Sequence, residues 1–387
     1  MAFPAPSPTR HTPRRTRDPT HPRHTLQKDG RRPGPVQPPV DRPRSSPRPR
    51  PRPRPAMAPL HVFALALLVA AAAAVPAGER FMWVPDSEGI LHMVDLLDVE
   101  PEDTPVPFFN GEKDVDLMLY TQNNPSSPEY ILQSDPSKSP SFNPANPTRF
   151  VLHGWTSSYK QMDPIRKAYI DTGKNWNVVL VDWHSPASSE YSISKRNSRR
   201  VGEYLAEVIQ HLVANRGLRL DDVYIIGHSL GGQAAGVAGN RLGGQVARVV
   251  GLDAAAPLFG TTSEKNRLDP TDAKVVQGIH TNGGLLGWKD PLGDVDFFPN
   301  GGSSQAGCIL DVSGACAHNR SPTYYAESVV SQDFVGAECD SYSKYKKGTC
   351  SGNVHAPMGE WTDSSITGNF YLNTNSKSPY AQGNTGL

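Results

Sequence analysis

The chain has 387 residues, of which 37% are hydrophobic and 20% are charged, and its formal net charge is +1. This near-neutral total hides an uneven distribution, because residues 1–56 contain 14 of the 39 Lys and Arg residues but only 3 of the 38 Asp and Glu residues. The rest of the chain is therefore net acidic, which argues against nucleic acid as its partner.

Residues 1–56 are predicted to be a disordered extension rich in Arg and Pro. They contain 16 of the 37 prolines, and Arg and Pro alternate from Arg48 to Pro55. Proline has no amide hydrogen to donate and the like charges repel each other, so this segment should stay extended. Met57 follows as a second plausible start, which makes an upstream extension of the reading frame a simpler interpretation than an arm that binds RNA or membranes.

Residues 57–77 are predicted to be a signal peptide. Their apolar run, residues 62–75, is rich in alanine and too short to span a bilayer comfortably, and small residues between positions 72 and 77 supply cleavage sites. One departure from the usual pattern is that no Lys or Arg lies between Met57 and this run. The sequence therefore predicts a secreted, extracellular protein, with a signal anchor as the alternative.

Residues 78–112 are acidic, contain prolines and show no hydrophobic period, so they are either a pro-segment or a wrap over the surface. Residues 113–387 have the pattern of one α/β domain. The predicted strands are 115–121, 129–133, 148–153, 177–182, 223–226, 246–252 and 274–280, and the predicted helices are 163–171 and 198–215, the second stopping at Gly217. Such alternation indicates a mostly parallel sheet with helices on both faces and chemistry at the carboxyl ends of the strands.

Ser229 is the predicted nucleophile. It lies in Gly227-His228-Ser229-Leu230-Gly231, between the apolar strand 223–226 and a helical stretch over 233–238. A serine flanked by glycines on a sharp strand-to-helix turn is the nucleophile elbow of the α/β-hydrolase fold, because the glycines let the backbone pass close by and the turn exposes the hydroxyl. The fold class predicted is therefore α/β, of the α/β-hydrolase type.

A serine nucleophile needs a histidine base and an acid that orients the base, and in this fold they follow in the order Ser, Asp or Glu, His. Asp253 ends the strand after the serine, so it is the predicted acid; Asp269 and Asp272 are rivals that a turn-forming Asp-Pro explains more simply. His318 is the predicted base, since it lies downstream in a loop anchored by a cysteine. Two other histidines, His153 and His228, are expected to shape the site instead, and His280 ends the predicted strand 274–280.

The oxyanion hole of such an enzyme uses two backbone amides. We expect them to come from Leu230, which follows the nucleophile, and from Trp155, which follows the strand 148–153. No metal or other cofactor is needed for this chemistry, and the cysteines show neither C-x-x-C nor Cys/His metal spacing. The four cysteines allow three pairings, of which proximity favours Cys308–Cys316 and Cys339–Cys350, in agreement with export.

Several ordered blocks of the sequence resemble the secreted animal lipases of the pancreatic lipase family, including insect gut lipases and the phospholipase A1 branch. The resemblance covers roughly residues 110–385 and is carried by residues 150–155, 181–183, 227–231, 251–253, 267–270, 279–281, 295–302 and 316–318. It implies the same catalytic triad of Ser229, Asp253 and His318. It also implies action on lipid at a membrane, micelle or droplet surface.

Two departures from the family pattern bear on the substrate. Only seven residues separate Cys308 from Cys316, where triacylglycerol lipases of this family carry a long lid, and the loop 281–296 also looks short. The chain ends at Leu387 without the C-terminal β-sandwich that pancreatic lipases use to bind a protein cofactor. We therefore expect a serine carboxylester hydrolase of the phospholipase A1 or galactolipase type. The alternatives are a triacylglycerol lipase and, in another class, a non-catalytic lipid-binding or yolk-storage protein on the same scaffold.

Overall fold

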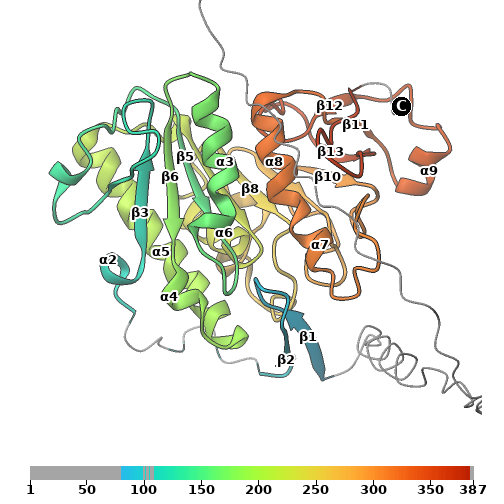
Figure 1. The fold of residues 1–387 in the computed structure, drawn as a ribbon, viewed down its shortest axis with the longest axis horizontal. Helices are drawn as coiled ribbons and strands as arrows, with labels where there is room; N and C mark the ends of the chain where they lie inside the picture. Colours follow the sequence, from blue (N-terminus) through green and yellow to red (C-terminus); the bar gives the residue numbers. More distant parts are fainter. Residues whose placement is uncertain (1–79, 99–100, 102–103, 105–108, 384–387) are drawn as a thin grey trace, which may run out of the picture. The chain divides into compact units, whose positions relative to one another are not determined.

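The computed structural model describes residues 80–98, 101, 104 and 109–383 (Figure 1). The predicted extension over 1–56 and the predicted signal peptide over 57–77 lie outside these residues. Among the described residues, no helix is long and apolar enough to cross a membrane.

A large mixed sheet organises the described chain. Its strands follow the spatial order β12-β11-β13-β10-β9-β8-β7-β5-β6-β3-β4. The run from β13 to β6 is parallel throughout, and antiparallel strands extend it at both edges. The strands are β3 (Asp116–Tyr120), β4 (Glu129–Tyr130), β5 (Thr148–Leu152), β6 (Asn177–Asp182), β7 (Val223–His228), β8 (Arg248–Leu252), β9 (Val276–Ile279), β10 (Val295–Pro299), β11 (Val335–Glu338), β12 (His355–Pro357) and β13 (Gly368–Leu372).

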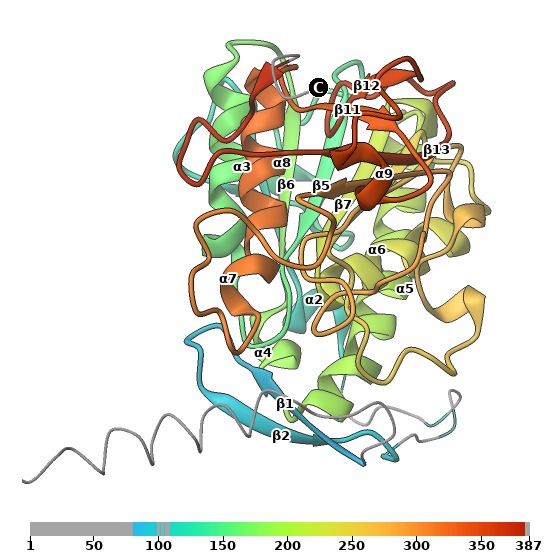
Figure 2. The same cartoon turned by 90° about the vertical axis from the view of Figure 1, so that its right-hand side faces the viewer.

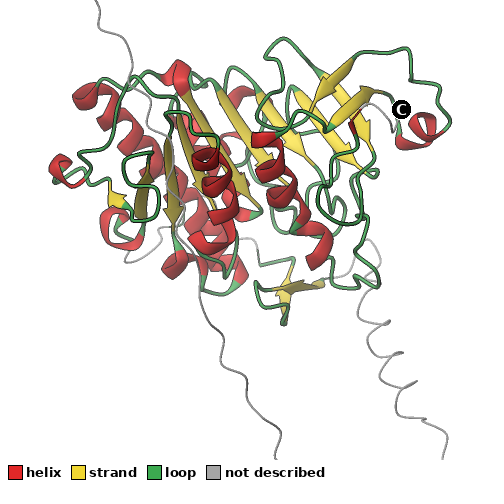
Figure 3. Cartoon of the chain, turned by 45° about the horizontal axis from the view of Figure 1, so that its top comes forward, coloured by secondary structure: helices red, strands yellow, loops and turns green. Residues whose placement is uncertain are grey.

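Helices cover both faces of the sheet, as Figures 2 and 3 show. The helices α3 (Tyr159–Asp171) and α8 (Arg320–Val330) pack together on one face, and α5 (Tyr191–Arg216) and α6 (Leu230–Arg241) pack together on the other. Shorter helices are α2 (Gly111–Asp114), α4 (His184–Ala187), α7 (Ala315–His318) and α9 (Tyr342–Lys346). With its parallel centre, its helices on both faces and a serine turn between β7 and α6, the chain has the α/β-hydrolase fold that the sequence predicts.

The strands build two apolar cores because successive side chains point to opposite faces of the sheet. In β6, Val179 and Val181 join the core that includes Leu205 of α5, whereas Val178 and Leu180 join the core that includes Ile165 of α3. Both faces of these strands are thus buried, which explains their unbroken apolar runs.

Most predicted elements are present, with shifted ends. The helix expected over 198–215 begins earlier, at Tyr191, and ends at Arg216. Gly217 follows it, and its φ of 74° is the left-handed conformation typical of a helix stop. The strand expected over 129–133 is reduced to Glu129–Tyr130. The strands from β10 to β13 and the helix α8 were not predicted. In the same region a disulfide joins Cys339 to Cys350, one of the two favoured pairings.

The described part of residues 78–112 folds over the body as an antiparallel hairpin of β1 (Phe81–Pro85) and β2 (Leu91–Asp95). Val84 and Val94 are buried in the same core as helices α5 and α6. Figures 1 and 2 show the hairpin beside α4 and α7, at one end of the molecule's sheet.

Asp269 and Asp272, the rival acids, form a structural turn instead. Asp269 caps the 3-10 helix Pro270–Asp272, and its amide donates to Oδ2 of Asp272 at 2.9 Å. Asp272 is fully buried, and burial together with the neighbouring Asp269 carboxylate raises the pKa of Asp272 to about 8.

This raised pKa predicts a pH-dependent contribution to stability. The folded chain holds the Asp272 proton more tightly than the unfolded chain, where the pKa is about 4, so the free energy of unfolding should fall as pH rises from about 4 to about 8. The variant Asp272→Asn keeps a neutral side chain at every pH. Its Tm should therefore drop less than that of the parent across this range in a thermal unfolding series, while exposed Asp290→Asn should follow the parent. Parallel curves for Asp272→Asn and the parent would contradict the argument.

Candidate active site

Ser229 lies at the tip of the turn between β7 and α6 in a strained conformation. Its φ and ψ are 57° and −123°, outside the regions that non-glycine residues favour. Its amide donates to the carbonyl oxygen of Leu252 at 3.1 Å, and its own carbonyl accepts from Ala255 at 3.1 Å. A Cβ on Gly227 would lie 2.0 Å from the carbonyl oxygen of Gly231, so only glycine fits before the turn. The turn is thus hydrogen-bonded to the end of β8 and to the segment after it, and within the turn the backbone of Gly227 packs closely against that of Gly231.

Asp253 and His318, the predicted acid and base, are brought together next to this turn. Nδ1 of His318 lies 2.5 Å from Oδ2 of Asp253, and both side chains are buried. An ionised carboxylate only accepts hydrogen bonds, so Nδ1 carries the proton and Nε2 is left as the basic nitrogen. Ser229 and His318 line the same pocket.

The second oxygen of Asp253 is held by the segment that follows β9. Oδ1 accepts from the amides of Thr281 and Asn282 at 2.8 and 2.9 Å. Gly287 packs against the same carboxylate, since a Cβ there would lie 2.3 Å from Oδ1. These contacts therefore hold the Asp253 carboxylate turned toward His318.

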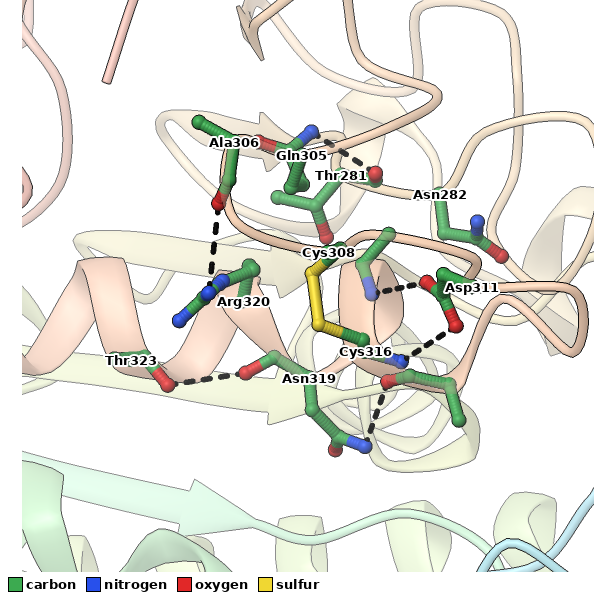
Figure 4. The surroundings of a disulfide bond; sticks show 12 residues. Thr281, Asn282, Gln305, Ala306, Cys308, Asp311, Cys316, Asn319, Arg320 and Thr323 are labelled. Atoms are coloured by element: carbon green, nitrogen blue, oxygen red, sulfur yellow. Dashed lines mark hydrogen bonds between the residues drawn. A yellow bond between two sulfur atoms is a disulfide. The ribbon is translucent and has the colours of Figure 1, made fainter. Parts of the chain in front are cut away.

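His318 ends the short helix α7, which is anchored from several sides. Cys316 in this helix forms a disulfide with Cys308, and the carboxylate of Asp311 accepts from the amides of Cys316 and Ala317 at 3.1 and 2.7 Å (Figure 4). Among the described residues, Cys308, Asp311 and Cys316 are the only group with metal-ligand spacing, but both sulfurs are bonded to each other. The arrangement therefore serves to position the histidine.

His228, which directly precedes Ser229 in the turn, contacts both the backbone and the ring of His318. Its Nε2 lies 3.1 Å from the carbonyl oxygen of His318, and the two rings are 4.5 Å apart. Burial and the charge of the neighbouring His318 lower the pKa of His228 well below its usual range, so His228 stays neutral and donates from Nε2. These contacts place His228 where it can help to position His318.

The other two candidate histidines brace loops around the site. In His153, Nδ1 lies 2.8 Å from the carbonyl oxygen of Gly154 and Nε2 lies 3.0 Å from Asp182. His280 lies between the carbonyl oxygen of Trp288 and Asp296, at 2.9 and 2.7 Å. Burial disfavours a charged His280, but the hydrogen bond to Asp296 and its charge outweigh burial and raise the pKa of His280. Neither histidine lines the pocket of Ser229.

Trp155 and Leu230 carry the two backbone amides that are expected to form the oxyanion hole. Leu230 is the first residue of α6, where amides have no partner within the helix. Within the part of the chain that is described, neither amide donates a hydrogen bond to another residue. The Trp155 ring is buried against Tyr191, and its indole donates to the carbonyl oxygen of Ser189 at 2.9 Å. Two free donors beside a serine hydroxyl are suited to stabilise an oxyanion.

Sequence reasoning missed three residues of this site, Thr281, Asn282 and Gly287. The first two had a signal, because they directly follow a predicted parallel strand, and functional groups gather at such ends. Gly287 had none beyond its place in a glycine-rich loop. The hairpin residues Val84 to Ser87, which line the pocket, come from a segment without any periodic pattern.

Known proteins match most of the part of the chain that forms the α/β domain. The family described as Lipase matches residues 104–380. Pancreatic lipase-related protein 2 of Mus musculus is 34% identical over 272 residues, which are 63% of this chain and 56% of that protein. Pancreatic triacylglycerol lipase of Sus scrofa is 35% identical over 308 residues, which are 70% of this chain and 68% of that protein. The chain thus spans between half and about two thirds of these relatives.

Solved structures overlap with the chain only in part. The crystal structure of esterase PE8 has a TM-score of 0.29 and 16% identity, and covers 35% of this chain and 68% of that one. The fold is therefore identified by the sheet order of the chain itself and by the family match.

The packing of Gly287 against Asp253 predicts a sensitive position away from the nucleophile. The change Gly287→Ala should push the carboxylate out of line with His318 and lower the reactivity of Ser229 toward a fluorophosphonate probe by about 100-fold, with little effect on Tm. The matched control is Gly260→Ala, where an added Cβ meets nothing within 4 Å. Equal probe reactivity of both variants would show that Asp253 does not depend on this contact.

Proposed function

The chain belongs to the lipase family, and from this membership we propose that it is a secreted hydrolase that cleaves carboxylic esters of lipids. The observation that carries the proposal is the convergence of Ser229, His318 and Asp253, with His318 and Asp253 joined at 2.5 Å and His318 sharing a pocket with Ser229. Two disulfides are consistent with an extracellular site of action.

The proposed reaction has two halves. Nε2 of His318 takes the proton of the Ser229 hydroxyl as Oγ attacks the ester carbonyl, and the resulting imidazolium is stabilised by Asp253. The C–O bond to the alcohol then breaks, and His318 returns the proton to the leaving oxygen. In the second half, His318 takes a proton from water as the water oxygen attacks the acyl carbon. The bond between that carbon and Oγ of Ser229 then breaks, His318 returns the proton to Oγ, and the fatty acid leaves.

The negative charge that develops on the carbonyl oxygen would be held by the amides of Trp155 and Leu230. Because Leu230 begins α6, the positive end of the helix dipole adds to this stabilisation. Both donors are fixed before substrate arrives, so little reorganisation is required during the reaction.

For the substrate, we propose a phospholipid or galactolipid in preference to triacylglycerol. The short segment from Cys308 to Cys316 and the short connection from β9 to β10 leave little chain to form a long lid, which favours substrates with bulky polar heads. Triacylglycerol remains the alternative, as several matched relatives carry the name pancreatic triacylglycerol lipase. A non-catalytic storage protein is disfavoured by the intact set of Ser229, Asp253 and His318.

Substitutions in the triad provide the first test. Hydrolysis of a soluble short-chain ester should fall by about 10⁴-fold in Ser229→Ala and in Asp253→Asn, because the first lacks the nucleophile and the second leaves His318 in the wrong tautomer. The exposed Ser351→Ala serves as the matched control and should keep the parent rate. A parent rate in Ser229→Ala would refute the assignment, and absence of hydrolysis by the folded parent would favour the storage function.

A panel of lipids provides the test of substrate class. Phosphatidylcholine, monogalactosyldiacylglycerol and triolein are compared at matched interfacial area, and fatty acid release is measured for the parent and for Ser229→Ala. The proposal predicts faster release from one of the two polar lipids than from triolein, with all release lost in Ser229→Ala. A clear preference for triolein would overturn the argument from the short segments.

A further inference from the structure

The hairpin of β1 and β2 presents an apolar face to the outside. Trp83 pairs directly with Met93 across the two strands, and Phe81 and Leu91 lie on the same face two residues along. These four side chains are exposed by 40%, 60%, 42% and 40% respectively. We call them the outer face of the hairpin.

An outer face of this kind is unusual for a hairpin that covers a domain. An antiparallel hairpin with one face on a core normally turns polar residues to solvent, but here the inner residues Val84 and Val94 are also apolar and buried. Packing of the hairpin against its own domain therefore leaves large apolar side chains exposed to solvent. A cluster of four exposed, large apolar side chains is typical of a surface that binds an apolar partner.

The hairpin also closes the pocket of the candidate active site. Residues Val84 to Ser87 line that pocket together with Ser229 and His318. Ser87 is attached beside Trp155, because its amide donates to the Thr156 hydroxyl and its own hydroxyl donates to the Thr156 carbonyl oxygen, both at 2.8 Å. The pocket has a volume of about 40 Å³, whereas sites for ligands of drug size have about 300 Å³ or more. The hairpin therefore forms one wall of a narrow site.

A second pair of exposed apolar side chains lies in a segment that leads to the same pocket. The disulfide loop between Cys308 and Cys316 exposes Ile309 and Leu310 almost completely, and the loop leads into Ala315, which lines the pocket. Apolar side chains are thus presented by two elements at the mouth of one site.

The charges nearby are mostly negative. Within residues 80–98, one arginine stands against four carboxylates, and the loop adds Asp311. Arg80 is paired with Asp95 at 2.6 Å. A surface with this charge gains nothing from anionic lipid, so apolar contact is its only source of attraction.

We propose that the outer face of the hairpin binds an uncharged or zwitterionic lipid surface. The proposal rests on the proposed function, since the pocket that the hairpin borders is the one that would take lipid esters. Transfer of the four side chains into the acyl region supplies the binding energy, and it places the pocket beside the lipid that carries the substrate.

The experiment measures binding apart from catalysis. The parent for this test is the full chain with Ser229→Ala, which cannot hydrolyse the vesicles, and its binding to phosphatidylcholine vesicles is measured by flotation. Adding Trp83→Ser and Met93→Ser should weaken binding by at least about tenfold. A second pair, Phe81→Ser with Leu91→Ser, should do the same, so the result does not depend on one variant folding well. Thermal unfolding checks that each variant is folded.

The matched control changes two exposed valines that lie in other parts of the fold, far from the hairpin. Val330, the last residue of α8, and Val354 are exposed to a similar degree, and Val330→Ser with Val354→Ser should change binding by less than about twofold. Unchanged binding in both hairpin pairs would overturn the proposal. A second result would also overturn it: the parent sediments as a dimer, and the hairpin variants sediment as monomers but still bind vesicles. The outer face would then join two copies of the chain.

Two further arms separate this proposal from the proposed function. With Ser229 intact, the ratio of vesicle hydrolysis to hydrolysis of a soluble ester should fall about tenfold in the hairpin variants. No hydrolysis of either substrate by the parent would refute the function while the flotation result stands on its own. Adding phosphatidylglycerol to the vesicles should leave binding equal or weaker, and a marked increase would contradict binding through an uncharged apolar face.

Discussion

The close approach of backbone segments at Ser229 is the constraint on which the rest of the structure depends. A side chain on Gly227 would collide with the carbonyl of Gly231, and one on Gly231 would lie 2.3 Å from the carbonyl oxygen of His153. The strand β7, the helix α6 and the segment after β5 can therefore meet at one point. At this point Ser229 adopts its strained conformation, and Leu230 follows it as the first residue of α6. Ser229 and Trp155 line one pocket there, so local strain accompanies the placing of the hydroxyl.

Around this point, the carboxyl ends of neighbouring parallel strands supply the remaining groups. Asp253 follows β8, while Thr281 and Asn282 follow β9 and hold the Asp253 carboxylate in place. His318 comes from outside the sheet, on a helix of a single turn, and such a helix has little stability of its own. The disulfide, the Asp311 cap and the hydrogen bond from His228 compensate for that weakness. The nearby disulfide loop thus has two uses, to fix the base and to expose apolar side chains at the pocket mouth.

The sequence was informative where local chemistry has a fixed meaning. The central strands are unbroken runs of β-branched residues, the serine turn has glycines at fixed offsets, and Gly217 ends a long amphipathic helix, so all three could be predicted. The strands from β10 to β13 could not, because they are short and their burial depends on contacts with distant parts of the chain. The hairpin was missed for a related reason. Its outer and inner faces are both apolar, so residues 81–95 lack the alternation by which a half-buried strand is recognised.

The central claim is that Ser229 is the activated nucleophile of this site. It is tested most directly by treating the purified protein with a fluorophosphonate and locating the adduct by peptide mass spectrometry. The account predicts one adduct per chain, on Ser229, and none on Ser229→Ala under the same conditions. An adduct on another serine, or equal labelling of parent and Ser229→Ala, would contradict it.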